Sequence, residues 1–325
     1  MIKNIVKYVD TKSISDMETL LEKFNLNKYS DIKKFFKDNN FSIIETEKKM
    51  DEPIGYTIGN GDVTFFVKKE KYSNELIEIF NIFNRDKSWG IAPFVPYLYY
   101  SASLGSKKNQ YYCFYETFSL NLAELLVMSN YEARTISEVI ITVLIALLYF
   151  YDQKILHNDL HVKNVMINIG DDVRIRNIYV HDNDVFTVMS KYRDIVVNDF
   201  GLSCSTKQNI VEIKKIYDAF LARFYYIELL KVSHDESIYE RIFFIDLWRF
   251  LSSVLSQIKN NMNDDLMSML LLFNKYVEIS TQILLYKNMY DYKSVVISLI
   301  YEMIFIHEAY SVYDNISKTN TYKIP

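Results

Sequence analysis

The sequence predicts an α+β fold with a small strand-rich part near its N-terminus and a longer, mostly helical part after it. Short runs rich in β-branched and aromatic residues, which strands favour, concentrate between residues 41 and 118. Segments with the apolar spacing of amphipathic helices dominate from residue 119 onward. The 325 residues are 50% hydrophobic and 24% charged, an ordinary globular composition with enough length for two lobes. We therefore expect strands and helices to segregate along the chain, with a boundary near Phe118.

Residues 1–40 are predicted to form a helical extension, because apolar residues recur at helical spacing over residues 14–24 and 30–38. Three strands follow, over residues 41–44, 54–58 and 63–67. The last two are separated by Gly59-Asn60-Gly61, and Asn-Gly is a preferred centre of a tight hairpin turn because both residues tolerate positive φ. The next elements are a helix over residues 74–83 and strands over residues 95–101 and 111–116.

The second part contains several segments with helical periodicity, near residues 120–128, 132–152, 211–231, 239–258, 264–286 and 292–310. The run Val139–Phe150 is the most apolar of the chain. It is too short to cross a bilayer and is expected to form a buried core helix. Short strand-like runs also occur in this part, over residues 165–169, 173–180, 185–189 and 195–197.

Charge and cysteine content narrow the classes of partner. The formal net charge is −4, whereas nucleic-acid-binding domains are usually basic, so we expect no nucleic-acid partner. No signal-peptide cleavage site follows the lysine-bearing N-terminus, and no glycine follows Met1 for myristoylation, so we expect no membrane association. The two cysteines, Cys113 and Cys204, are too few for a disulfide framework and indicate a reducing, cytoplasmic environment.

Two short segments of the second part contain acidic and amide side chains in a pattern that suggests catalysis. Residues 157–164 read His-Asn-Asp-Leu-His-Val-Lys-Asn, so that Asp159 precedes the amide of Asn164 by five residues. A second acid, Asp199, follows the apolar run 195–197 and begins the sequence Asp-Phe-Gly. Phosphoryl transfer requires an acid that positions or deprotonates the attacking hydroxyl, and groups that fix Mg²⁺ on the phosphates. These two segments therefore indicate a phosphotransferase.

Together the segments resemble the protein-kinase superfamily, whose catalytic loop has the pattern H-x-D-x-x-x-x-N and whose metal-binding motif is D-F-G. The resemblance covers roughly residues 41–258 and implies a two-lobed protein-kinase-like fold. A small β-rich N-lobe would span residues 41–118, and a mostly helical C-lobe would span residues 119–325. In this family the residue that matches Asp159 serves the acceptor hydroxyl, and the residues that match Asn164 and Asp199 hold Mg²⁺.

The resemblance also implies a lysine that grips the ATP phosphates. Lys68 ends the apolar run of the third strand and matches the lysine of V-A-I-K, although a register with Lys69 in this position stays open. The register with Lys68 puts Phe66, rather than Val67, over the adenine. Glu75, on the following helix, is the first choice for the partner of the lysine, with Glu78 as the second.

Two further matches complete the resemblance. The run from Tyr115 to Phe118 follows a strand and resembles the hinge, in which backbone groups of Glu116 and Phe118 would bond the adenine edge. An ordinary strand-to-helix turn is the alternative. Asp246-Leu247-Trp248 resembles the D-x-W motif that begins the central helix, where the acid caps backbone amides of the catalytic loop. A plain helix N-cap is a compatible interpretation, since Asp is favoured there.

Several positions depart from the pattern of the superfamily. The loop over residues 45–53, which would cover the phosphates, contains no glycine. Asn158 stands where many kinases have an arginine that binds a phosphorylated loop, so the resemblance implies activity without activating phosphorylation. His161 replaces the lysine typical of serine/threonine kinases, and histidine is common there in phosphotransferases that act on small alcohols.

The region after the catalytic loop departs as well. No proline lies between Pro96 and Pro325, so the A-P-E motif that closes the activation segment of protein kinases is missing. The spacer between Asn164 and Asp199 is longer than usual in the superfamily, and residues 170–194 are interpreted as an inserted β-rich segment. The H-N-D-L-H pattern, this insertion and a composition typical of AT-rich coding sequence resemble kinases of large DNA viruses, for which the host cytoplasm would be the location.

The function that the sequence favours is ATP- and Mg²⁺-dependent transfer of a phosphoryl group to a hydroxyl, with Ser or Thr of a protein as the acceptor. A small-molecule kinase of the choline or aminoglycoside type is the alternative enzyme. A pseudokinase that only binds partners is the alternative outside catalysis. Intact Asp159, Asn164 and Asp199 argue against the pseudokinase, whereas the lack of a glycine-rich loop argues for it.

Overall fold

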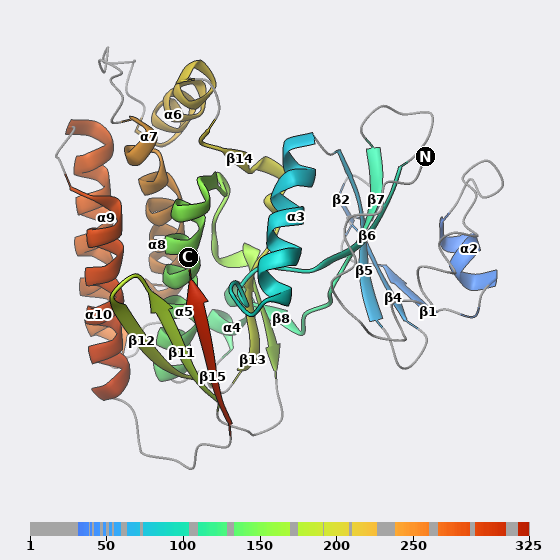
Figure 1. The fold of residues 1–325 in the computed structure, drawn as a ribbon, viewed down its shortest axis with the longest axis horizontal. Coiled ribbons are helices and arrows are strands. Elements are labelled where there is room, and N and C mark those ends of the chain that lie inside the picture. The colour runs from blue at the N-terminus through green and yellow to red at the C-terminus, as the bar shows by residue number, and fades with distance from the viewer. Residues whose placement is uncertain are drawn as a thin grey trace. The chain divides into compact units, whose positions relative to one another are not determined.

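The structure is a computed structural model in which two compact units can be recognised (Figure 1). One unit takes in the chain up to Trp89 together with Pro96–Phe118, and the other takes in Gly90–Val95 together with Ser119–Pro325. The predicted helix over residues 14–24 lies outside the described residues. The structure describes residues 32–38, 40, 42–45, 48–49, 52–53, 55–59, 64–71, 74–103, 110–128, 133–169, 175–190, 192–207, 210–225, 238–259, 266–286, 290–309 and 318–324.

The first unit is built on an antiparallel sheet with the strand order β1-β4-β5-β7-β6. These strands are β1 (Ser42–Glu45), β4 (Gly55–Gly59), β5 (Thr64–Lys71), β6 (Leu98–Ser103) and β7 (Gln110–Tyr115). Two short strands, β2 (Lys48–Lys49) and β3 (Glu52–Pro53), pair with each other. Strands β4 and β5 are neighbours, with Gly59 opposite Thr64, as expected for the predicted hairpin, although residues 60–63 of its turn lie outside the described part.

Helices α2 (Ile32–Asp38) and α3 (Asn74–Ser88) cover opposite faces of this sheet. The ring of Phe114 on β7 lies 6.0 Å from that of Phe36 on α2, measured between centroids. The next residue, Tyr115, lies 5.7 Å from Phe80 on α3. Adjacent residues of a strand point to opposite faces, so the two helices cannot share a face. Helix α3 continues five residues beyond the predicted end at residue 83, because Asn84 and Asp86 are buried within it.

Helix α5 (Ala133–Gln153) forms the core of the second unit, as its apolar pattern predicts. By length and hydropathy it could cross a membrane, but 94% of its apolar window is buried inside the protein, which is typical of a core helix. Tyr292, at the start of α10, stacks on Tyr151 of α5 at 5.0 Å and meets the edge of Phe244 of α8 at 5.0 Å. The helices around α5 are α4 (Leu122–Val127), α6 (Ile210–Tyr225), α7 (Ile238–Arg241), α8 (Phe243–Lys259), α9 (Met267–Tyr286) and α10 (Tyr292–Ala309).

Short strands and turns flank the loop of residues 157–164 and the segment that begins at Asp199. The structure pairs them in the orders β13-β10-β8 and β14-β9. They are β8 (Leu120–Asn121), β9 (Ile155–Leu156), β10 (Val165–Ile169), β13 (Tyr192–Val197) and β14 (Cys204–Ser205), with 3₁₀ turns η1 (Val162–Asn164) and η2 (Phe200–Leu202). The predicted helix over residues 239–258 is interrupted at Ile242, where α7 ends and α8 begins.

The β-rich segment after β10 folds as a hairpin of β11 (Ile175–His181) and β12 (Asp184–Ser190). A strand that the sequence did not predict, β15 (Lys318–Ile324), adds to β11 in parallel, with Ile175 opposite Lys318 and His181 opposite Ile324. Figure 1 shows β15, the red arrow near the C-terminus, beside β11. In this strand only Tyr322 and Ile324 are large and apolar, so its sequence carries no clear strand periodicity.

Polar contacts of His181, Asp152, Asp182 and Lys293 fasten the hairpin to the helices. His181, at the end of β11, is fully buried, and its Nε2 lies 2.6 Å from Oδ2 of Asp152 at the end of α5. Lys293 on α10 bridges the two sides, with its Nζ 2.8 Å from Asp152 Oδ1 and 3.0 Å from Asp182 Oδ2. The bonds to Lys293 lower the pKa of Asp182. One network therefore joins the hairpin, α5 and α10.

Candidate active site

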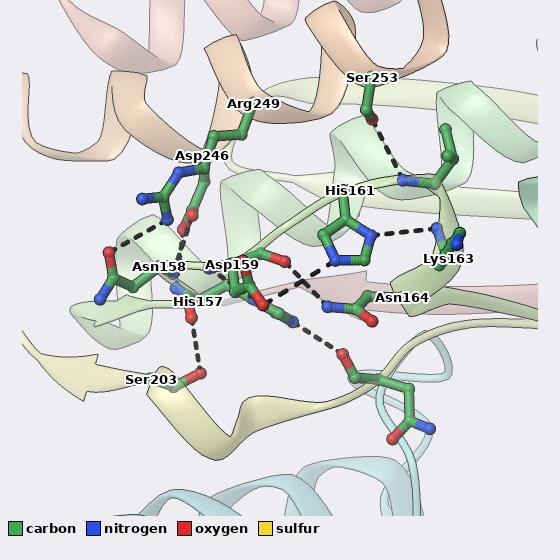
Figure 2. A network of polar contacts seen from close by, with 12 residues as sticks. His157, Asn158, Asp159, His161, Lys163, Asn164, Ser203, Asp246, Arg249 and Ser253 are labelled. Carbon is green, nitrogen blue, oxygen red and sulfur yellow. Dashed lines mark hydrogen bonds and ion pairs between the residues drawn. The ribbon is translucent and has the colours of Figure 1, made fainter. Parts of the chain in front are cut away.

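The loop that contains Asp159 is held from inside the core by Asp246 on α8 (Figure 2). The backbone N–H groups of His157 and Asn158 donate to the two carboxylate oxygens of Asp246, at 2.7 and 2.9 Å. Asp246 is 1% exposed. Burial raises the pKa of its carboxyl, and the nearby His157 and Arg249, together with the two amide bonds, offset part of that rise. The side chain thus caps the backbone amides of this loop, the contact that the D-x-W resemblance implies.

Asp159 and Asn164 are joined within the same loop. Asn164 is 7% exposed, and its Nδ2 donates to the backbone carbonyl of Asp159 at 2.9 Å. This bond orients the amide, whose oxygen is the atom able to bind a cation. The side chain of Asp159 is 41% exposed, so its carboxylate is accessible from solvent.

The segment that leads to Asp199 is bonded to the same loop. The N–H of Asn198 donates to the carbonyl of Asn164 at 2.8 Å. The N–H of Asp159 donates to Nδ1 of His157, so the ring proton is assigned to Nε2, which donates to the carbonyl of Asn198 at 2.8 Å. His157 therefore links the two motifs.

Asp199 itself adopts a left-handed backbone conformation, with φ 60° and ψ 62°, at the start of η2. Such values are uncommon for a residue other than glycine and persist only where the surroundings enforce them. The next residue, Phe200, is 1% exposed, with its ring 4.7 Å from His157 and 5.6 Å from Phe150. This packing anchors the turn while Asp199 stays exposed.

The side-chain oxygens in this region are suitable ligands for Mg²⁺ that is already bound to phosphates. Among the described residues, no three His, Cys, Asp or Glu side chains gather in one group that could hold a metal. Mg²⁺ usually keeps several waters and takes one or two protein oxygens together with substrate phosphates. The carboxylate of Asp199 and the amide oxygen of Asn164 are a set of this kind, and they fit the cation that the sequence implies.

His161 lies next to Asp159. Its Nδ1 accepts from the N–H of Lys163 at 3.2 Å, which assigns the ring proton to Nε2, and this atom is 3.9 Å from Oδ2 of Asp159. Burial lowers the pKa of His161, although the nearby Asp159 acts in the opposite direction. The neutral ring therefore turns its N–H toward the carboxylate of Asp159.

The sheet register of the first unit separates Lys68 from Lys69. Phe66 lies opposite Tyr115 and Lys68 lies opposite Cys113, so these residues share one face of the sheet. Tyr115 contacts α3, so Lys68 belongs to the α3 face and Lys69 to the other. Lys68 is half-buried, whereas Lys69 is exposed.

The remaining candidates also belong to the first unit. Glu75 is half-buried in the first turn of α3, and Glu78 is exposed. The N–H of Glu116 donates to the carbonyl of Tyr97 at 3.3 Å, so a contact of the Glu116 backbone with adenine would have to use its carbonyl. The Glu116 side chain accepts from Lys87 Nζ at 2.5 Å. Phe118 is half-buried and is the last residue of this unit.

Arg249 and Ser203 are parts of the loop network that sequence reasoning did not identify. Arg249 Nη1 donates to Oδ1 of Asn158 at 3.2 Å, and Ser203 Oγ donates to the carbonyl of His157 at 3.1 Å. A signal for Arg249 was present, because residues three apart on a helix lie on one face and Arg249 follows Asp246 by three. Nothing in the local sequence marks Ser203.

A scan of the sequence against models of known protein families finds no match, and neither does a search of the curated proteins. Among solved structures, the chain is similar to a chain in the crystal structure of the yeast RNA Pol II CTD kinase CTDK-1 complex, with 17% identity and a TM-score of 0.33. The match covers 51% of this chain and 47% of that chain, about half of each.

Proposed function

We propose that the protein is a kinase that transfers the γ-phosphoryl group of ATP, with Mg²⁺, to a hydroxyl of a protein Ser or Thr. The observation that carries the proposal is the joining of three candidate groups in one bonded network. Asp159 and Asn164 share a hydrogen bond at 2.9 Å, and the residue before Asp199 is bonded to Asn164 and His157 at 2.8 Å. Chance matches to two short motifs would not be expected to lie together.

Each group of the network has a chemical task in this proposal. The accessible carboxylate of Asp159 positions the acceptor hydroxyl and accepts its proton. The oxygens of Asn164 and Asp199 hold the cation that neutralises charge on the phosphates during transfer. Asp246 keeps the loop rigid, because its two bonds fix the backbone N–H groups of the two residues that precede Asp159.

The first unit would supply the contacts to the nucleotide. Lys68 would bind the α- and β-phosphates with Glu75 as its partner, and backbone groups of Glu116 and Phe118 would meet the adenine edge. The position of Lys68 on the α3 face, the face that carries Glu75, supports this pairing over one with Lys69.

A small alcohol is the second candidate acceptor, and His161 beside Asp159 favours it. A neutral ring with its N–H 3.9 Å from the Asp159 carboxylate can donate to an acceptor hydroxyl, whereas lysine would bring a full charge. The proposal of a protein acceptor and that of a small alcohol share the same catalytic groups. They differ only in what reaches Asp159.

The test is a phosphotransfer assay with γ-labelled ATP against a panel of proteins and small alcohols. We expect Asp159→Asn to lower the rate by about 10²–10⁴-fold, the usual contribution of a general base. The variant should keep the thermal stabilisation given by Mg-ATP, because the side chain serves the acceptor and not the nucleotide. Normal turnover by this variant would refute the assignment, and nucleotide binding without any transfer by the wild type would indicate a pseudokinase.

A further inference from the structure

The side chain of Asn158 connects two elements that are far apart in the sequence. Its Oδ1 accepts from Nη1 of Arg249 on α8 at 3.2 Å, and its Nδ2 donates to the carbonyl of Leu202 in η2 at 3.3 Å. Figure 2 shows Arg249 reaching the amide of Asn158 from the helix above. One amide thus links α8 to the turn that begins with Asp199.

Helix α8 holds residue 158 at two points. Asp246 accepts from its backbone N–H at 2.9 Å, and Arg249, one turn later, donates to its side chain. The guanidinium of Arg249 lies 5.3 Å from the ring centroid of Phe220 on α6, which restricts its position. Because α8 is a core helix, both contacts come from a rigid support.

Asparagine meets the chemical requirements of this position better than other residues. The backbone of Asn158 is left-handed, with φ 61°, a conformation that Asn and Asp tolerate and most other residues avoid. The side chain must also accept from a guanidinium and donate to a carbonyl. Asn offers both functions, whereas Asp only accepts and Arg only donates.

Neighbouring contacts hold the rest of the segment against the same loop. Ser203 Oγ donates to the carbonyl of His157 at 3.1 Å, and the N–H of Thr206 donates to the carbonyl of Lys154 at 2.8 Å. Between them, Cys204 pairs with Leu156 in the β14–β9 ladder. Residues 202–206 therefore run along residues 154–158, and the amide of Asn158 holds the end nearest Asp199.

We propose that Asn158 is a positioning residue: the chain Arg249–Asn158–Leu202 holds the turn after Asp199 in place without a phosphate on that segment. This inference rests on the proposed kinase function for its effect on rate. This connection of Arg249, Asn158 and Leu202, called the clamp below, lies within the second unit and can be measured without catalysis.

The experiment compares Asn158→Asp and Asn158→Gly with wild type by hydrogen exchange of peptides that span residues 199–206. Asn158→Asp keeps the acceptor for Arg249 but loses the donor to Leu202, and Asn158→Gly tolerates the left-handed backbone but removes both. We expect about fivefold faster exchange in both variants, the factor that corresponds to a hydrogen bond of about 1 kcal/mol. Asn320→Asp, which removes a comparable amide donor on β15, is the matched control and should leave this segment unchanged.

A second comparison tests whether Arg249 acts through Asn158. Arg249→Gln should accelerate exchange of the same peptides, and adding it to Asn158→Gly should produce no further acceleration, because both remove one linkage. Unchanged exchange in folded Asn158→Asp and Asn158→Gly would overturn the clamp. Faster exchange together with an inactive wild type would uphold the clamp and refute the kinase function.

If the wild type is an active enzyme, we expect Asn158→Asp and Asn158→Gly to have a lower kcat than wild type, with a nearly unchanged KM for the acceptor. Phosphatase treatment of wild type should leave the rate unchanged, because no phosphate contributes to the arrangement. A large loss of rate after this treatment, restored by phosphorylation within residues 202–210, would overturn the proposal.

Discussion

Lys68 and Lys69 are adjacent cations that the pleat of β5 places on different faces. On the α3 face, the ring of Phe66 covers Gly55, where an added Cβ would come within 2.6 Å of that ring. Gly55 is the cross-strand partner of Lys68, so Lys68 emerges beside this aromatic surface. A lysine that binds phosphate from a half-buried sheet face has few alternative positions, because its stem is confined by its neighbours.

We expect Lys68→Met to lower kcat/KM for ATP by about 10- to 100-fold, because a charge-assisted hydrogen bond is worth about 1.5–3 kcal/mol. Lys69→Met should change this constant by less than about threefold, since an exposed lysine on the other face contributes little. Steady-state kinetics on both purified variants, with matched melting temperatures, checks the prediction. The reverse order would shift the register by one residue and put Val67 in place of Phe66 over the adenine.

At the scale of secondary-structure elements, α10 packs on α5 through a buried histidine. His307 is 2% exposed, and its Nδ1 lies 2.8 Å from Oγ of Ser137. Ser137 Oγ donates to the carbonyl of Arg134, so the serine oxygen accepts from the Nδ1–H of His307. Burial, aided by the charge of Arg134, lowers the pKa of His307 to about 4.

This interface predicts a loss of stability in mild acid. His307 has a pKa of about 6.5 in the unfolded chain and about 4 in the folded protein, so between these values the unfolded state binds more protons. The contribution of neutral His307 to the free energy of unfolding is therefore fully present above pH 6.5 and is lost as the pH falls toward 4. At pH 5 the loss is about 2 kcal/mol by this linkage.

Urea unfolding of wild type and His307→Leu at pH 7.5 and pH 5 measures the effect. Other titrating groups act in both proteins, so the difference between the two pH dependences isolates His307. We expect the wild type to lose about 2 kcal/mol more than the variant between these pH values. Equal losses in both proteins would mean that folding leaves the pKa of His307 at its unfolded value.

Over the whole molecule, the success of sequence reasoning follows the strength of local signals. Helix α5 was predictable because an unbroken apolar run of its length has few alternatives to the core. Strand β15 was not, since its stability comes from pairing with β11, more than a hundred residues earlier. The break at Ile242 was missed because the apolar pattern continues across it.

The candidate site divides in the same way. The five-residue spacing was enough to predict that Asp159 and Asn164 lie close together, because both belong to one short loop. No role for Arg249 was predicted from the sequence. Its contact with Asn158 depends on the left-handed backbone of Asn158, which directs the Asn158 side chain toward α8. The sequence showed only that Asn158 itself brings no cation for a loop phosphate, and the structure adds that Arg249 donates to its side-chain oxygen.

The C-terminal strand gives the last prediction, because it ties the end of the chain to the hairpin of β11 and β12. Tyr322 stacks on Tyr179 at 5.2 Å, and Ile324 is 5% exposed. Removing residues 318–325 should cost about 2–4 kcal/mol, from the burial of one aliphatic side chain and one aromatic pair. For a chain of this size the melting temperature should fall by about 3–6 °C.

Two point variants sharpen this test, because adjacent residues of β15 face opposite ways. Tyr322→Ala should reproduce about half of the loss, since it removes the ring stack, whereas Lys323→Ala, at an exposed position, should stay within about 0.5 kcal/mol of wild type. Phosphotransfer measured well below the melting temperature should persist in the truncated protein, because no bond of the Asp159 loop involves β15 among the described contacts. Unchanged melting after truncation would show that β15 adds nothing to the stability of the hairpin, and lost activity in a folded truncated protein would show that the strand supports the site.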